Sequence, residues 1–161
     1  MPANQVNTND QSIFKSESIN LIHSSFKQND AESKKSTARF EFSISADVYT
    51  DFIVSKLTVK LRNQIALENH QTIVQSFECC FAGYFSTSPT APEDARINFA
   101  KINSLSIIWP YAREYISDTL RRTGIPFPIL PIINPQVVAE KLDQEDLVHI
   151  QMYDHSFKDP A

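Results

Sequence analysis

The chain has 161 residues, of which 42% are hydrophobic, and this content is typical of one domain with its own apolar core. Its formal net charge of -4 offers no basic stripe for a phosphate backbone, so composition disfavours a nucleic-acid partner. The first residues lack the basic and apolar regions of a signal peptide, and no stretch approaches the about 18 apolar residues of a membrane span. We therefore expect a cytoplasmic protein without membrane insertion.

Residue types common in catalytic and metal sites are poorly arranged for such chemistry. Cys79 and Cys80 are adjacent, so they cannot form the spaced pairs that bind zinc, and on a strand they would point to opposite faces as reduced thiols. The two glycines, Gly83 and Gly124, are too few for a phosphate-binding loop or a nucleophile elbow. The histidines show no metal-ligand spacing: His23, His70, His149 and His155. We predict no enzyme activity, no catalytic residue, no metal and no cofactor.

The N-terminal half shows the alternation of β-strands. After a polar arm, assigned to residues 1–17, a first strand is expected at about 18–27. The segment ARFEFSISA at 38–46 alternates apolar with polar residues and predicts a half-buried second strand. Its apolar residues are Phe40, Phe42, Ile44 and Ala46.

Two further strands are predicted from the same period of two. The segment 51–67 alternates and contains β-branched residues, which favour a strand over a helix. The segment 71–86 places five apolar residues on one side: Ile73, Phe77, Cys79, Phe81 and Phe85. Four successive strands with short connections predict a four-stranded antiparallel sheet.

From Ser104 the apolar period changes to about four, which predicts an amphipathic helix. Gly124 fits the left-handed position after a helix end, and Asp118 and Arg122 form a favourable pair four residues apart. Pro110 lacks an N–H and crowds the carbonyl of Ser106. We therefore expect either a kink at Pro110 or a helix that begins near Trp109.

The helix is followed by the apolar, proline-punctuated segment IPFPILPIINP. Prolines at 126, 128 and 131 fix φ and remove donors, so this strap is expected to stay extended and to display its apolar side chains. A second helix is predicted after Asn134-Pro135, because a capping side chain there precedes a proline at the first helical position. Strands followed by helices predict an α+β fold with the helices on one side of the sheet.

The segment WPYAREYISDTLRRTGIPFPILPIINP resembles the signature of the SecB family of protein-export chaperones, which carry a similar F-P-Y-A-R-E helix, a glycine stop and a proline-rich strap. The order and length of the four preceding strands are also similar. The matching positions are Pro110, Tyr111, Ala112, Arg113, Glu114, Gly124, Phe127, Pro128 and Pro131. The resemblance implies a chaperone domain at 18–150, followed by a C-terminal tail at 151–161.

The resemblance implies an ATP-independent holdase that binds unfolded preproteins, forms a homotetramer built as a dimer of dimers, and passes its clients to the SecA motor. The many aromatic residues, eleven Phe and five Tyr, support an apolar surface kept for a partner, although a core and subunit interface would also use them. The strap beside the second strand would form a long groove for extended chain, since apolar burial is non-directional. The alternative is a strap packed wholly against its own subunit.

Two sets of residues are assigned to these roles. The client-binding groove is predicted from Phe40, Phe42, Ile44, Ile125, Phe127, Ile129, Val138 and Leu142. The subunit interface is predicted from the helix stripe, on the argument that one four-stranded sheet cannot cover it all. Its members are Ile108, Tyr111, Ala112, Tyr115 and Ile116.

The resemblance also places an acidic SecA-docking patch on the sheet, and here the sequence departs from the family. Glu78 keeps the carboxylate of the fourth strand, but the acids of the first strand are replaced by His23 and Lys27. Because opposite charges govern docking, we expect SecA binding to be weak. Two alternatives therefore stay open: a SecB-like chaperone of a toxin–antitoxin system, and a dedicated adaptor with one fixed partner.

Overall fold

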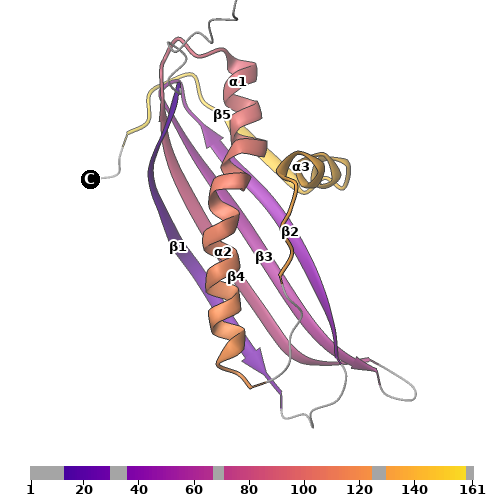
Figure 1. Cartoon of the computed structure of the whole chain (residues 1–161). Helices are drawn as coiled ribbons and strands as arrows, with labels where there is room; N and C mark the ends of the chain where they lie inside the picture. Colours follow the sequence, from indigo (N-terminus) through magenta and orange to yellow (C-terminus); the bar gives the residue numbers. More distant parts are fainter. Residues whose placement is uncertain (1–12, 30–35, 67–70, 125–129, 159–161) are drawn as a thin grey trace, which may run out of the picture.

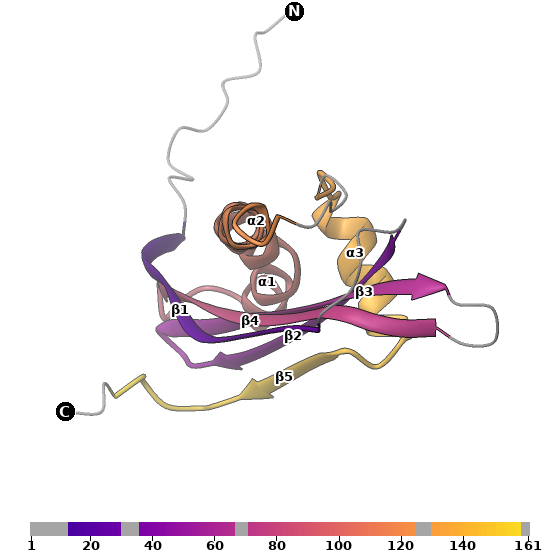
Figure 2. The same cartoon turned by 90° about the horizontal axis from the view of Figure 1, so that it is seen from below.

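A computed structural model of the chain describes residues 13–29, 36–66, 71–124 and 130–158, and it shows an α+β fold. A twisted five-stranded sheet forms one layer, and the helices form a second layer on one of its faces (Figure 1, Figure 2). The elements are β1 Phe14–Gln28, β2 Ser36–Val48, β3 Phe52–Ala66, β4 Gln71–Thr87, α1 Glu93–Asn98, the π-helical η1 Phe99–Asn103, α2 Ser104–Arg121, α3 Pro135–Gln144 and β5 Val148–Met152.

The strand order is β1-β4-β3-β2-β5. The first four strands pair antiparallel, which confirms the predicted sheet. A fifth strand, β5, was not predicted and pairs parallel with β2 at the sheet edge. β1 begins at Phe14, inside the range assigned to the polar arm, and β5 ends at Met152, inside the range assigned to the tail.

The sheet face below the helices forms the core. Cys79 is fully buried there, and Cys80 lies half-buried on the opposite face, as the alternation predicts. Burial raises the pKa of the Cys79 thiol to about 12, with smaller contributions from Cys80 and Glu78. A Cβ atom at Gly83 would lie 2.7 Å from the ring of Phe85 and 2.9 Å from Cδ1 of Ile108, so glycine leaves room for the Phe85 ring and for Ile108 of α2.

A bulge in β4 corrects one predicted side chain. Asn63 pairs with Gln75 and Gln64 pairs with Ile73, so Val74 is an extra residue in the strand. The insertion reverses the alternation, and Ile73 is 37% exposed instead of sharing the buried face of Phe77. Alternation in the sequence cannot show such a bulge.

The main helical segment is longer than predicted, because α1 and η1 run continuously into α2. α2 passes through Pro110, so the helix does not begin at Trp109. Pro110 and Ser106 both lie on the exposed side, where water can bond the carbonyl that lacks an N–H partner. The predicted stop is confirmed, since α2 ends at Arg121 and Gly124 has φ +72°.

The second helix begins as predicted. Asn134 Oδ1 accepts hydrogen bonds from the backbone N–H groups of Gln136 at 3.1 Å and Val137 at 3.3 Å, and Pro135 occupies the first turn. These bonds satisfy donors that a helix start would leave without a partner. The cap therefore fixes where α3 leaves the extended segment before it.

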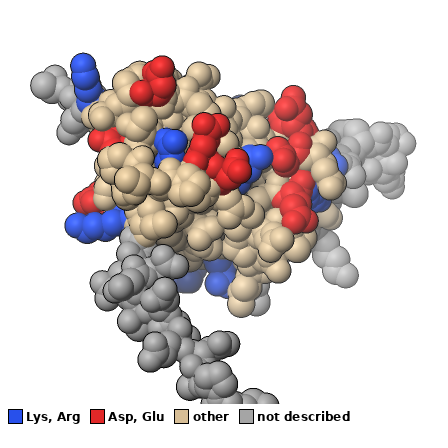
Figure 3. Space-filling model, turned by 90° about the horizontal axis from the view of Figure 1, so that it is seen from above, with Lys and Arg blue, Asp and Glu red and all other residues tan. Residues whose placement is uncertain are grey.

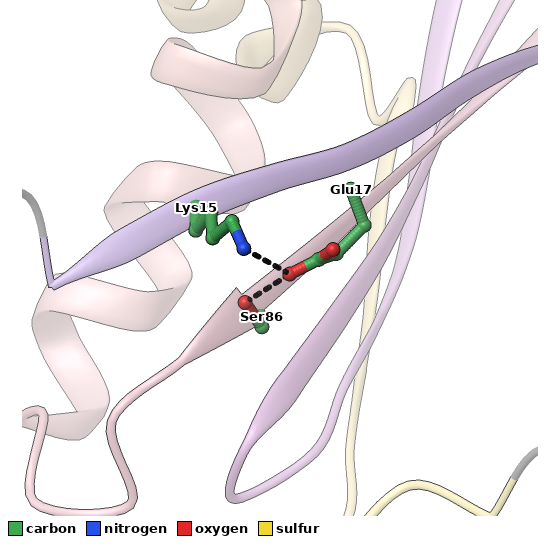
Figure 4. Close-up of polar contacts among 3 residues, drawn as sticks. All are labelled: Lys15, Glu17 and Ser86. Atoms are coloured by element: carbon green, nitrogen blue, oxygen red, sulfur yellow. Dashed lines mark hydrogen bonds and ion pairs between the residues drawn. The ribbon is translucent and has the colours of Figure 1, made fainter.

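Polar contacts tie the strands and helices together. The Glu17 carboxylate accepts a hydrogen bond from the Ser86 hydroxyl at 2.7 Å and lies 3.8 Å from Lys15 Nζ, which joins β1 to β4 beside a register shift (Figure 4). Under the end of α2, buried Asn63 donates to Gln75. The Gln75 amide in turn donates to the Thr123 hydroxyl. This network fixes the end of α2 above the bulge.

Candidate functional site

A row of aromatic side chains forms one wall of a groove beside β2. The rings of Phe40 and Phe42 are stacked with centroids 6.5 Å apart, and Phe42 meets Trp109 of α2 edge to face at 5.2 Å. Phe40 and Phe42 are only half-buried, whereas Trp109 is buried. The two phenylalanine rings therefore combine contact with the core and access from solvent.

The part of the strap that the structure describes is bonded to α2. Trp109 Nε1–H donates to the backbone oxygen of Pro131 at 3.2 Å, and Arg113 Nε–H donates to the backbone oxygen of Leu130 at 3.2 Å. Leu130 is buried in the core, in contrast to the display expected along the strap, whereas Ile132 is 88% exposed. α2 thus holds this end of the strap through its backbone carbonyls.

The remaining predicted client-binding residues are placed unequally. Val138 on α3 is half-buried and packs against the core. Ile44 and Leu142 are 3% and 5% exposed, so they are core residues that a client cannot reach in this conformation, which corrects their assignment. Ile125, Phe127 and Ile129 lie outside the described residues.

The groove opens at the edge of β2. A hollow of about 540 Å³ there is lined by both faces of the strand and by the end of α3. Its lining residues are Arg39, Phe40, Glu41, Phe42, Ser43, Thr58, Lys60, Lys141, Glu145 and Leu147. Phe40 and Phe42 are apolar members of this lining, and its charged members have both signs. Such a hollow can take an extended polypeptide with apolar side chains.

The helix stripe assigned to a subunit interface lies mostly in the core of its own chain. Ile108, Ala112 and Ile116 are buried against the sheet, so the argument that one sheet cannot cover the stripe is wrong for these three residues. Tyr115 is half-buried, packs on Phe77 and Phe81, and donates to Ser24 Oγ at 2.9 Å. Tyr111 is 53% exposed, so this side chain alone of the five offers a large apolar surface to a partner.

The predicted motor-docking residue lies on the sheet face opposite to the helices. Glu78 is half-buried, and its cross-strand neighbour on β3 is Lys60. The exposed residues His23 and Lys27 of β1 share this face, with Lys27 pairing Ser76 and Ser76 pairing Arg62. Lys27, Lys60 and Arg62 line a hollow of about 530 Å³ together with Glu78. Basic side chains therefore surround the one carboxylate among its lining residues.

The structure adds two features that the sequence prediction missed. Apart from Phe14 and Ile19, every residue of β1 is exposed, including three large apolar residues, Leu21, Ile22 and Phe26. The segment VHIQM of β5 alternates apolar and polar residues, and this period could have predicted the strand. Both features lie at the two edges of the sheet.

Figure 3 shows acidic and basic side chains interspersed at the end of the molecule that carries α1 and the C-terminal segment. Within the described ranges, no group of three or more His, Cys, Asp or Glu residues could hold a metal ion. None of the described helices combines the length and apolarity that crossing a bilayer requires.

Comparison with known proteins identifies relatives of this fold. The family model described as preprotein translocase subunit SecB matches residues 8–145. Among solved structures, the chain resembles the Mycobacterium tuberculosis Rv1957 SecB-like chaperone in complex with a ChAD peptide from the Rv1956 HigA1 antitoxin, with a TM-score of 0.64 and 21% identity. That similarity covers 74% of this chain and 90% of the other. A search of curated proteins gave no significant match.

Proposed function

Since the chain belongs to the SecB family, we propose that it is an ATP-independent holdase chaperone that binds unfolded preproteins and keeps them competent for Sec-dependent export. The observation that carries this proposal is the half-open aromatic wall of Phe40 and Phe42 beside a hollow of about 540 Å³ at the β2 edge. Aromatic rings that are packed on one side and open on the other can bury a client's apolar side chains without prior refolding.

The physical properties of the groove suit clients that share no sequence. Burial of apolar area is non-directional, so the two phenylalanine rings accept many apolar side chains. The charged lining residues have both signs and favour a hydrated hollow: Arg39, Glu41, Lys60, Lys141 and Glu145. We infer that affinity rises with the length of client that lies along the groove.

A second candidate function is the guarding of an antitoxin. The SecA-docking face implied by the family is acidic, whereas here Lys27, Lys60 and Arg62 surround Glu78. The positive charges on this face repel a basic partner surface and so oppose its docking. They favour a client that is not handed to SecA. The similar Mycobacterium tuberculosis chaperone was solved with an antitoxin peptide, which supports the same candidate.

We infer that the chain assembles into a homotetramer, arranged as a dimer of dimers. Two surfaces support assembly: the exposed apolar edge of β1 with Leu21, Ile22 and Phe26, and the exposed Tyr111 on α2. An unpaired strand edge can pair with a second copy of itself, and an exposed aromatic ring on a helix can pack against another helix layer. Sedimentation velocity at micromolar concentration measures this, and a strict monomer contradicts it.

The function is tested by suppression of aggregation. The purified protein, without nucleotide, is mixed with several unrelated unfolded proteins, and light scattering is followed. A holdase suppresses aggregation of most of them, and Phe40→Ser weakens the suppression, whereas Asn98→Ala, exposed on α1 and outside the lining of the hollow, does not. Suppression of a single partner, and of no other, would instead identify a dedicated adaptor.

A further inference from the structure

The C-terminal strand β5 occupies part of the edge of β2. Its five residues pair parallel with Ile44 to Val48, and the strand lies past the end of the family match at residue 145 (Figure 2). Ile44 N–H donates to the backbone oxygen of Leu147 at 2.9 Å, and Tyr153 N–H donates to the backbone oxygen of Val48 at 2.8 Å. These two bonds mark the ends of the paired stretch.

An aromatic clamp holds the segment after β5 against the β2–β3 turn. Tyr153 stacks on Tyr49 with centroids 4.6 Å apart, and Phe157 stacks on Phe52 at 4.5 Å. The backbone N–H of Phe157 donates to Asp51 Oδ1 at 2.9 Å. The clamp therefore holds the far end of the segment through contacts that add to the strand pairing.

The pairing of β5 itself is shallow. Its apolar side chains Val148, Ile150 and Met152 are only half-buried, and its polar side chains His149 and Gln151 are exposed. A short strand paired on one side, in parallel, is weakly held compared with the long antiparallel strands of the sheet. Its release would leave the packing of α2 on β3 and β4 in place.

The hollow of about 540 Å³ continues along the same edge. It is lined by residues 39–43 of β2 and by Leu147, the residue directly before β5. The edge of β2 is thus hollow along its first part and covered by β5 along its second part. A polypeptide extended in the hollow would run into the beginning of β5.

We propose that β5 is a resident strand, which occupies in cis the part of the β2 edge where an extended client segment docks, and that a client displaces it. This inference rests on the proposed function. The partner is an unfolded polypeptide with alternating apolar residues, because β5 already shows how the edge binds such a segment through backbone bonds at Ile44 and Val48. If β5 is docked in about nine of every ten molecules, the apparent affinity for the client falls about tenfold.

A reversible disulfide between the strands tests the proposal. Ser45 and His149 are paired across the two strands, and both side chains are exposed. Neighbouring strands are about 4.8 Å apart, within the span that a disulfide bridges. The double variant Ser45→Cys/His149→Cys is made with Cys80→Ser, so that the half-buried native thiol cannot mispair.

Affinity is measured for fluorescently labelled, reduced and carboxymethylated α-lactalbumin, with the variant oxidised and then reduced. We expect the oxidised form to bind at least about tenfold more weakly than the reduced form, since the bridged strand cannot leave. The variant with Ser45→Cys and Cys80→Ser alone should not respond to reductant. Equal affinity in both redox states would overturn the proposal. If neither the reduced variant nor the wild type binds this client, the proposed function fails instead.

Two further measurements do not depend on the disulfide. At saturating client, hydrogen exchange should show that the Tyr153 N–H loses its protection, because displacement of β5 breaks its bond to the Val48 oxygen. The Ile44 N–H should stay protected, because a client carbonyl replaces the Leu147 oxygen as its acceptor. Retained protection of Tyr153 N–H in the complex would show that β5 stays in place.

Phe157→Ala weakens the clamp and should tighten client binding, whereas Lys158→Ala, next to it and exposed, should not.

Discussion

A pair of substitutions on β2 separates client binding from folding. Phe40 and Ile44 share the face below the helices, but Phe40 is half-buried and Ile44 is 3% exposed. Ile44→Ala should lower the free energy of unfolding by about 2–5 kcal/mol, because it leaves a cavity in a packed site. For a chain of 161 residues this corresponds to a fall in Tm of roughly 4–20 °C. Phe40→Ala should cost only about 1–2 kcal/mol, since a fully buried phenylalanine loses about 3–5.

Client affinity should change in the opposite order. Phe40→Ala removes an apolar anchor and should weaken binding about tenfold, which is about 1.4 kcal/mol, whereas folded Ile44→Ala should bind as the wild type does. Urea unfolding followed by circular dichroism gives the stabilities. Trp109, the single tryptophan, lies 5.2 Å from the Phe42 ring and reports client binding by its fluorescence. If Phe40→Ala destabilises as strongly as Ile44→Ala and leaves client affinity unchanged, Phe40 belongs to the core and the groove lies elsewhere.

Three other predictions concern the α3 cap, the two cysteines and the basic residues of β1. Asn134→Ala should lower the free energy of unfolding by about 1 kcal/mol through loss of the α3 cap, and Asn134→Asp should retain it, as urea titration can show. At pH 8 iodoacetamide should modify Cys80 and spare Cys79, because only about one in ten thousand thiols with a pKa of about 12 is deprotonated at that pH. If mass spectrometry finds Cys79 modified in the folded protein, this result contradicts its burial. Changing His23 and Lys27 to Glu should strengthen SecA binding, with a smaller gain at high salt. Tight SecA binding by the wild type would mean that another surface docks the motor.

The strand pattern could be predicted best for β2, β3 and β4, because each of these strands has a buried face. Along most of β2 and β3 a side chain's position in the alternation decides its burial, so the sequence shows both strand and face. One departure is Ile73, where one extra residue in β4 reverses the alternation. A bulge depends on pairing with the neighbouring strand, and this pairing is not a property of the β4 sequence alone.

The helix stripe shows why the candidate interface was less predictable than the helix. Periodicity identified the apolar side of α2 correctly, but it does not say which surface that side meets. Ile108, Ala112 and Ile116 pack on their own sheet, and Tyr111, at the margin of the stripe, remains exposed. The same apolar residue types stabilise a helix on its own sheet and form a surface for a partner, so the sequence pattern does not distinguish the two roles.

The two edges of the sheet illustrate a further limit, because an edge exists only once the strand order is known. β1 presents a long exposed edge with Leu21, Ile22 and Phe26, which suits a permanent partner such as a second copy of the chain. The β2 edge differs from the β1 edge. β5 covers Ile44 to Val48, and charged residues line the hollow along residues 39–43. A covering that is short, parallel and half-exposed protects the edge from aggregation and can still be exchanged for another strand. This difference favours assembly at β1 and reversible client binding at β2.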